Sequence, residues 1–137
     1  MPESRPSCVL LADRHHGLTE GVRGLLATAF GTVVMVADEA SLLEGADRIR
    51  PDVAIVDISL GQDRGLGWLQ ELRKRCPGVK VIVLSVHDEQ SVRRAAMDAG
   101  ADAFVLKRAI ATDLLDAIEA VRGGSAGEPP AAARNAG

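Results

Sequence analysis

The segment Val53-Ala54-Ile55-Val56-Asp57 is a run of four apolar residues that ends at a carboxylate. A strand with one face in water alternates apolar and polar side chains, but no residue of this run before Asp57 is polar. The pattern therefore predicts a strand whose two faces are both covered. Four more short apolar runs occur along the chain, at residues 8–12, 33–36, 79–84 and 103–106.

Apolar residues at helical spacing follow each of these runs. They occupy segments 18–29, 42–49, 66–76, 92–99 and 114–121. Pro51 closes the second segment and Pro77-Gly78 closes the third, while Asp88 and Gly100 are expected to cap the two ends of the fourth. Five apolar strands that alternate with five helices favour a doubly wound α/β domain, in which a parallel sheet is covered on both faces.

The composition describes one ordinary soluble domain. The chain has 137 residues, of which 47% are hydrophobic and 26% are charged. The net charge of −3 and the lack of a basic stripe argue against direct binding of nucleic acid. No run is long enough to span a bilayer and no basic-plus-apolar leader is present, so we expect a cytoplasmic domain with no membrane contact. The two cysteines, Cys8 and Cys76, are expected to be free thiols.

Polar side chains stand where four of the five predicted strands end. They are Asp13 and Arg14 after the first run, Asp57 after the third, Ser85 after the fourth and Lys107 after the fifth. In a doubly wound sheet, the carboxyl ends of the strands form the edge where ligands bind. Any single polar residue there can simply mark a strand leaving the core. Two carboxylates, a hydroxyl and an ammonium together predict phosphoryl transfer to a carboxylate.

In that chemistry Asp57 is the nucleophile and becomes an acyl phosphate. Lys107 pairs with the phosphoryl oxygens, Ser85 donates a hydrogen bond to one of them, and Asp13 helps to hold a divalent cation. No Gly-rich phosphate loop follows the first strand, where the sequence reads ADRHHGLTEG. An enzyme of nucleotide or small-molecule chemistry is therefore disfavoured.

Two further features have a functional and a structural interpretation. His15, His16 and His87 are expected at the same edge and raise the alternative of a transition-metal site. Adjacent histidines on a loop point apart, which disfavours that alternative. Trp68 begins the third helix near the loop after Asp57, and we expect it to be partly packed rather than to stack on a substrate.

Residues 7–122 resemble the receiver domain of two-component response regulators. The resemblance rests on four blocks in the family's order and spacing: VLLADRHHGLTEGVRGLL, PDVAIVDISLGQDRGLGWLQ, VIVLSVHDE and AGADAFVLKR. It is closest to receivers that carry a LuxR-type helix-turn-helix output domain. It implies a flavodoxin-like (CheY-like) fold with five parallel strands in the order 2-1-3-4-5 and five helices. It also implies a phosphoacceptor signalling domain, not an enzyme, which takes its phosphoryl group from a histidine kinase.

The resemblance assigns roles to individual residues. Asp57 falls at the phosphoacceptor and Lys107 at the family's lysine. Ser85 falls at the residue that moves towards the phosphoryl group, and Phe104 at the aromatic switch position, three residues before the lysine. Signalling is expected through the face made by the fourth helix, the fifth strand and the fifth helix.

The metal site departs from the family's pattern. The resemblance implies a Mg²⁺ ion held by Asp13, Asp57 and the backbone carbonyl of Ser59, together with a second acid that follows Asp13. Arg14 stands in the place of that acid, and a guanidinium does not ligate a cation. Mg²⁺ binding is therefore expected to be weakened or absent. Gly61 and Gln62 also replace the usual proline and glycine, so the loop after Asp57 is expected to differ in shape.

The orientation of the Arg14 side chain decides whether a metal site can persist beside Asp57. If it points inward, the formal charges of Asp13, Asp57, Lys107 and Arg14 sum to zero, and the drive to bind a dication largely disappears. Arg14 then either pairs with Asp57 or braces the phosphoryl oxygens. If it points to solvent, a weakened metal site persists. The functional alternative is a pseudo-receiver, a protein-interaction module that works without phosphorylation.

Residues 123–137, GGSAGEPPAAARNAG, are small and proline-rich. Such a segment buries no core, which predicts a flexible linker or tail. Either the chain is a stand-alone receiver or a C-terminal output domain, of the DNA-binding helix-turn-helix kind, is absent from it. Receivers of this style often pair through a helical face, so a homodimer is a further expectation.

Overall fold

The computed structural model describes residues 7–14 and 16–123. At its centre lies a sheet of five parallel strands in the order β2-β1-β3-β4-β5, as the resemblance implied. The strands are β1 (Cys8–Ala12), β2 (Thr32–Val36), β3 (Val53–Asp57), β4 (Lys80–Ser85) and β5 (Ala103–Leu106). All five predicted strands are confirmed, with bounds that differ by one residue at most.

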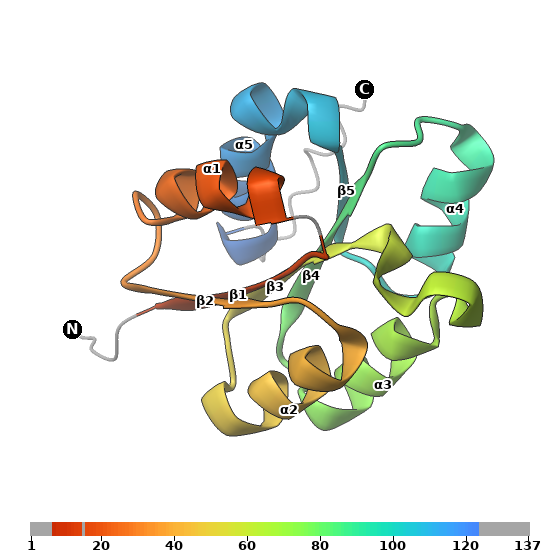
Figure 1. Ribbon diagram of the computed structural model, residues 1–137, viewed down its shortest axis with the longest axis horizontal. Helices are drawn as coiled ribbons and strands as arrows, with labels where there is room; N and C mark the ends of the chain where they lie inside the picture. Colours follow the sequence, from red (N-terminus) through yellow and green to blue (C-terminus); the bar gives the residue numbers. More distant parts are fainter. Residues whose placement is uncertain (1–6, 15, 124–137) are drawn as a thin grey trace.

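Helices cover both faces of the sheet, as a buried parallel sheet requires. α1 (His16–Leu26) and α5 (Ile110–Gly123) lie on one face, and α2 (Glu39–Ile49), α3 (Gly67–Arg75) and α4 (Gln90–Asp98) cover the other (Figure 1). Two 3-10 helices, η1 (Ile58–Arg64) and η2 (Lys107–Ala109), follow β3 and β5. The sequence pattern did not predict them, because such short turns carry no helical apolar period.

The strands contribute to two cores, since successive side chains of a strand point to opposite faces. Leu10 and Ala12 of β1 belong to the core under α2, α3 and α4, whereas Val9 and Leu11 belong to the core under α1 and α5. All five residues of the central strand β3 are buried. Burying one large aliphatic side chain stabilises a fold by about 1.5–3 kcal/mol, so these strand residues fix the sheet in place.

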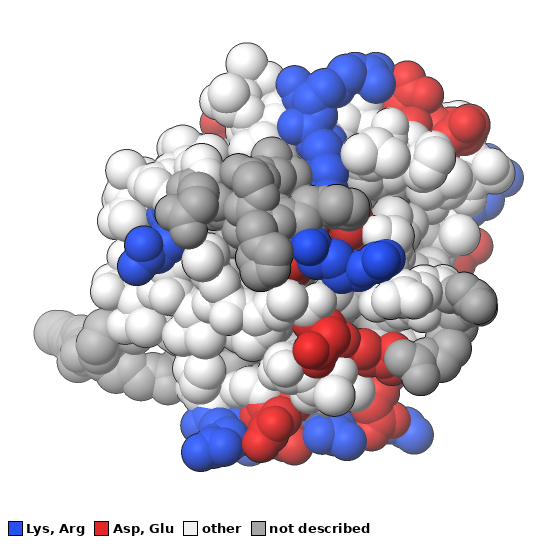
Figure 2. Space-filling model, viewed as in Figure 1, with Lys and Arg blue, Asp and Glu red and all other residues white. Residues whose placement is uncertain are grey.

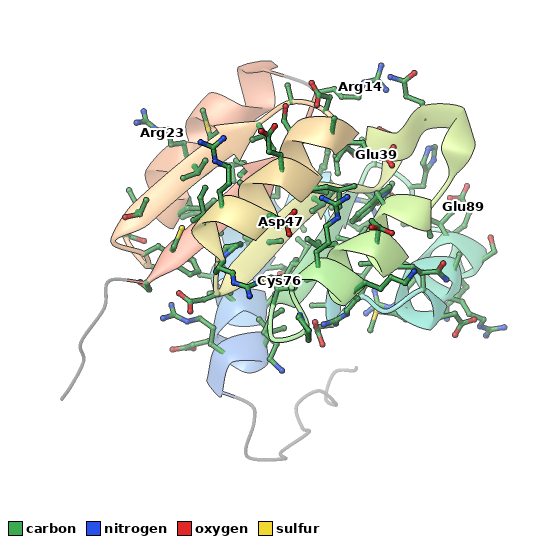
Figure 3. The ribbon with its side chains drawn as sticks, turned by 90° about the horizontal axis from the view of Figure 1, so that it is seen from below. Arg14, Arg23, Glu39, Asp47, Cys76 and Glu89 are labelled. Carbon is green, nitrogen blue, oxygen red and sulfur yellow. The ribbon has the colours of Figure 1, made fainter. Side chains whose placement is uncertain are left out.

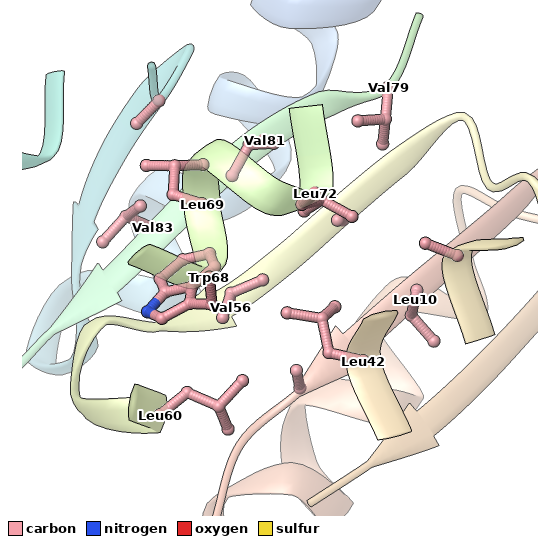
Figure 4. Packing of buried hydrophobic residues seen from close by; sticks show 14 of the residues in the cluster. Leu10, Leu42, Val56, Leu60, Trp68, Leu69, Leu72, Val79, Val81 and Val83 are labelled. Carbon is pink, nitrogen blue, oxygen red and sulfur yellow. The ribbon is translucent and has the colours of Figure 1, made fainter. Parts of the chain in front are cut away.

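Trp68 lies deeper than its sequence position suggested. The residue is 1% exposed and belongs to the same core as Val56, Leu60 and Leu69, which Figure 4 shows from close by. The expectation of partial packing was therefore wrong. Gly61 explains the difference, because a Cβ at that position would lie 3.0 Å from Cδ1 of the indole. The glycine that replaces the family's proline thus makes room for the tryptophan.

Two of the predicted helix caps behave differently. Gly100 has a φ of 118° just after the end of α4, as expected for a glycine that closes a helix. The expectation that Asp88 caps the start of α4 was wrong: the cap residue is Glu89, whose side chain makes no capping hydrogen bond. The physical reason is a competing partner, since the Asp88 carboxylate pairs with Arg108 at 2.9 Å.

The C-terminal helix α5 ends at Gly123, the first residue of the predicted tail. Residues 124–137 of that tail lie outside the described residues, and so does His15. None of the helices in the described part of the chain is long and apolar enough to cross a bilayer.

Candidate functional site

The polar residues predicted at the strand ends lie at one edge of the sheet. Asp57 is the last residue of β3 and Ser85 the last of β4, whereas Asp13 directly follows β1 and Lys107 directly follows β5. Parallel pairing brings these ends level, and Ser85 lies opposite Leu106, the residue before Lys107. We call Asp13, Asp57, Ser85 and Lys107 the Asp57 pocket.

Lys107 bridges the two carboxylates of this pocket. Its Nζ atom lies 2.9 Å from Oδ2 of Asp13 and 3.4 Å from Oδ1 of Asp57. The exposed fractions of the three side chains are 9% for Lys107, 1% for Asp13 and 4% for Asp57. Buried charges need a partner, and here one ammonium serves two carboxylates. Their formal charges, −2 and +1, leave a net of −1 in the pocket.

The backbone holds Asp13 and Asp57 in place. The N–H of Asp13 donates to the carbonyl of Val36 at 3.1 Å, which extends the pairing of β1 with β2 by one residue. Asp57 is both the end of β3 and the cap of η1, because its carboxylate accepts a hydrogen bond from the N–H of Ser59 at 3.4 Å. Each carboxylate is therefore fixed by a strand that the hydrophobic pattern predicted.

The side chain of Ser59 is a site residue that sequence reasoning missed. Its hydroxyl donates to Oδ2 of Asp57 at 2.7 Å, whereas the resemblance assigned only its backbone carbonyl to the site. The backbone contact had a signal, since an aspartate side chain commonly accepts from the N–H two residues on, but that pattern does not extend to the hydroxyl.

Ser85 is buried, and its hydroxyl is engaged inside its own loop. It accepts a hydrogen bond from the N–H of His87 at 2.9 Å and donates to the carbonyl of His87 at 3.0 Å. A serine hydroxyl carries one hydrogen, so this arrangement uses its donor on the loop and not on Asp57.

Phe104 lies on the same face of the sheet as Ser85. It pairs in register with Val83, which lies two residues before Ser85 on β4, and it is 9% exposed. The guanidinium of Arg93 on α4 lies 5.3 Å from the centre of the Phe104 ring, within reach of a cation–π contact.

Arg14 is exposed and makes no hydrogen bond or ion pair with any residue that the structure describes. Figure 3 shows it at the outer rim of the molecule. Of the two orientations that the sequence left open, the structure has the outward one. Asp57 is consequently engaged by Lys107 and Ser59 rather than by this guanidinium.

The transition-metal alternative can be examined only for the described side chains of this edge. Among the described residues, no three His, Cys, Asp or Glu side chains are grouped so that they could hold a metal ion. His87 is exposed, with its Nδ1 atom 3.9 Å from Oε1 of Glu89. Asp13 and Asp57 are the two carboxylates that Lys107 brings together at this edge.

The loop after Asp57 has an unusual backbone. Gln62 adopts φ 54° and ψ −129°, a conformation that glycine takes readily and a residue with a Cβ takes only with strain. Gln62 stands at the position where the resemblance led us to expect glycine, and its positive φ is one that a glycine would adopt without strain.

Charged side chains of both signs occur on the visible surface. Figure 2 shows acidic and basic side chains interspersed on the described part of the face it views, with no continuous basic stripe.

The chain is similar to known response regulators. It is 37% identical over 127 residues to the nitrate/nitrite response regulator protein NarP of Escherichia coli, covering 91% of this chain and 59% of the relative. It is 32% identical over 120 residues to the transcriptional regulatory protein DegU of Brevibacillus brevis, covering 86% of this chain and 51% of the relative. The chain thus spans between half and three fifths of these curated relatives.

Solved structures show the same fold. The receiver domain of the putative response regulator NarL from Mycobacterium tuberculosis is 27% identical, with a TM-score of 0.71 over 91% of this chain and 100% of that chain. A LuxR-family two-component response regulator from Aurantimonas is 25% identical, with a TM-score of 0.78 over 88% of this chain and 87% of that chain. The family model described as the response regulator receiver domain matches residues 9–119. This chain therefore belongs to the receiver-domain family of two-component response regulators.

Proposed function

We propose that this receiver domain accepts a phosphoryl group on Asp57 from a histidine kinase and passes the signal on through α4, β5 and α5. The observation that carries the proposal is the position of Lys107, whose ammonium lies between the carboxylates of Asp13 and Asp57. A cation held by two carboxylates can keep one of them and exchange the other for a phosphoryl oxygen.

The proposed step is a transfer between two nucleophiles. A carboxylate oxygen of Asp57 attacks the phosphorus of a phosphohistidine, and the new O–P bond forms as the N–P bond breaks. The bonding electron pair leaves with the imidazole nitrogen, so no oxidant or reductant is involved. Lys107 stays beside the phosphoryl oxygens and offsets their charge. Ser85 donates to one of them after its hydroxyl leaves the carbonyl of His87.

A Mg²⁺ ion fits the donor set as a two-carboxylate site. Mg²⁺ keeps several waters and commonly binds through one or two carboxylates plus phosphate oxygens. Asp13, Asp57 and the Ser59 carbonyl would hold it, and when bound it would neutralise charge on the phosphoryl oxygens. Arg14 adds no ligand, and Lys107 already contacts both carboxylates. We therefore expect weak Mg²⁺ binding before a phosphoryl group is present.

The second candidate function is a pseudo-receiver that acts without phosphorylation. The replacement of the second acid by Arg14 favours it. In its simplest form, Arg14 pairs with the carboxylate of Asp57 and blocks it. The exposed position of Arg14 weighs against that form. The contacts that Lys107 makes with both carboxylates favour phosphorylation as the first candidate.

The partners of the domain follow from the same proposal. A relative of this chain is a transcriptional regulatory protein, and one similar structure is of the LuxR family. Because the chain spans only part of such relatives, we propose that a C-terminal helix-turn-helix output domain contacts DNA and that this domain controls it.

The test is intact-mass spectrometry after incubation with acetyl phosphate, in Mg²⁺ and in EDTA. We expect a single phosphoryl adduct on the unmodified chain and none on Asp57→Ala. Asp116→Ala, which removes an exposed carboxylate on α5, is the matched control and should be labelled normally.

Comparing the adduct formed in Mg²⁺ with that formed in EDTA shows whether phosphorylation requires the metal ion. An adduct that needs Mg²⁺ means that the two-carboxylate site suffices. An adduct that survives EDTA means that side chains of the protein take over the role of the cation. The absence of any adduct, with Arg14→Asp restoring it, would replace the proposal by the pseudo-receiver.

A further inference from the structure

The loop between β4 and α4 is tied to the loop after β5 by one ion pair. Arg108 lies 2.9 Å from Asp88 through its Nη2 atom, with 65% and 58% of the two side chains exposed. Arg108 directly follows Lys107, and Asp88 lies three residues after Ser85. The pair therefore joins the segment that carries the serine of the Asp57 pocket to the segment that carries its lysine.

The same loop holds Ser85 in a closed turn. The hydroxyl of Ser85 exchanges two hydrogen bonds with the backbone of His87, and Asp88 is the next residue. For Ser85 to donate to a phosphoryl group on Asp57, the bond to the His87 carbonyl must break and the turn must open. The ion pair at Asp88 resists that opening, because it fixes the residue that directly follows the turn.

Asp88 has a second binding partner within reach along the chain. α4 begins at Gln90 without a side-chain cap, and aspartate is among the preferred residues for the backbone N–H groups at a helix start. Arg108 competes with the helix for this carboxylate, and it lowers the pKa of Asp88 through their hydrogen bond and charge. The ion pair therefore persists at neutral pH, and its release would free a carboxylate for the start of α4.

We propose that the Asp88–Arg108 pair holds Ser85 in its resting turn and that the pair opens when Asp57 accepts a phosphoryl group. Asp88 and Arg108 are thus positioning residues, which act through Ser85. This inference rests on the proposed function, because it describes how the phosphoryl site is kept in its resting form.

The test compares Asp88→Asn, Arg108→Gln and the reversed pair Asp88→Arg with Arg108→Asp. The first measurement is the solvent-exchange rate of the His87 amide by NMR, which needs no phosphorylation. The second is the rate of labelling by acetyl phosphate. Arg48→Gln, which breaks an exposed ion pair with Glu44 on α2, is the control and should change neither rate.

We expect both single variants to raise both rates by about two- to fivefold, the range for an exposed ion pair. The reversed pair should return both rates towards those of the unmodified chain, and 1 M salt should reduce the differences. If the variants acted only by changing the charge of the protein, the labelling rates would change differently. Losing a negative charge would speed the reaction with an anionic donor, and losing a positive charge would slow it.

Labelling rates that move in opposite directions in the two single variants would overturn the inference, and so would an unchanged His87 exchange rate. The test of the ion pair can be distinguished from the test of phosphorylation at Asp57. If the unmodified chain takes no label at all, the proposed function fails, and the His87 exchange rates alone decide whether the pair holds the turn.

Discussion

The two edges of the sheet both carry buried or half-buried charges, but they use them differently. At the amino edge, Arg73 donates to the carbonyls of Val79 and Gly100 and pairs with Asp102, which also accepts from the N–H of Val81. At the carboxyl edge, the ammonium of Lys107 pairs with the side-chain carboxylates of Asp13 and Asp57. Charges bound to backbone groups are tied to the fold, whereas charges bound to side chains can change partners. The comparison supports the placement of the proposed phosphoryl site at the carboxyl edge.

The amino edge also contains a pocket. A cavity of about 540 Å³ there is lined by residues that include Arg50, Asp52, Lys80 and Arg122. The C-terminal ends of α2, α3 and α5 point to this edge, where the helix dipoles are negative. The basic side chains are explained by those dipoles, and Arg50 donates to the carbonyl of Arg75 at the end of α3.

The strongest test of this comparison is Lys107→Met. It leaves two nearly buried carboxylates without their ammonium, so we expect a loss of about 3–5 kcal/mol in unfolding free energy, together with the loss of phosphoryl labelling. Chemical denaturation and intact-mass spectrometry measure the two effects. Lys80→Met, the same substitution at the exposed start of β4, is the control. If Lys107→Met were labelled normally, the charges of the carboxyl edge would have no role in phosphorylation, and the two edges would not differ in function.

The reciprocal test is Arg73→Met at the amino edge. Arg73 is 29% exposed and loses bonds to two carbonyls and one carboxylate, so we expect destabilisation by about 1–3 kcal/mol. The initial labelling rate of the folded fraction should stay within the error of the unmodified chain. A labelling defect larger than the loss of folded protein would contradict the assignment of this edge to the fold alone.

A sharper test inside the carboxyl edge is Arg14→Asp. It supplies the second acid that the family pattern has there, so we expect Mg²⁺ to bind about tenfold more tightly, an effect of roughly 1.4 kcal/mol. Isothermal titration calorimetry measures the change. Arg94→Asp alters the net charge equally on the exposed side of α4 and serves as the control. Equal tightening in both variants would assign the effect to net charge and not to ligation.

The smallest expected effect is that of Ser59→Ala. Removing the hydroxyl that donates to Oδ2 of Asp57 leaves the carboxylate less stabilised and more nucleophilic, so labelling should speed up by about two- to threefold. Ser59→Thr keeps the donor and should label at the original rate. Slower labelling of Ser59→Ala would mean that the hydroxyl assists the transfer instead of restraining Asp57.

The sheet could be predicted because its signal is local. The five apolar runs became the five strands, and the polar residues that end them, such as Asp57 and Lys107, meet because parallel strands end at one edge. The apolar character of a run is read from its own residues, and the remote helices that bury it only have to satisfy that requirement. The strand order came from the family resemblance, since no pattern within single strands specifies their neighbours.

The sequence by itself thus determined the strands, their alternation with helices and the chemistry gathered at the carboxyl edge. Only the tertiary structure decided the partners of individual polar and aromatic side chains. Asp88 binds Arg108 instead of capping α4, Trp68 is buried because Gly61 leaves it space, and Arg14 is exposed. The physical reason is that each outcome depends on which groups come within contact distance, and those distances exist only after folding.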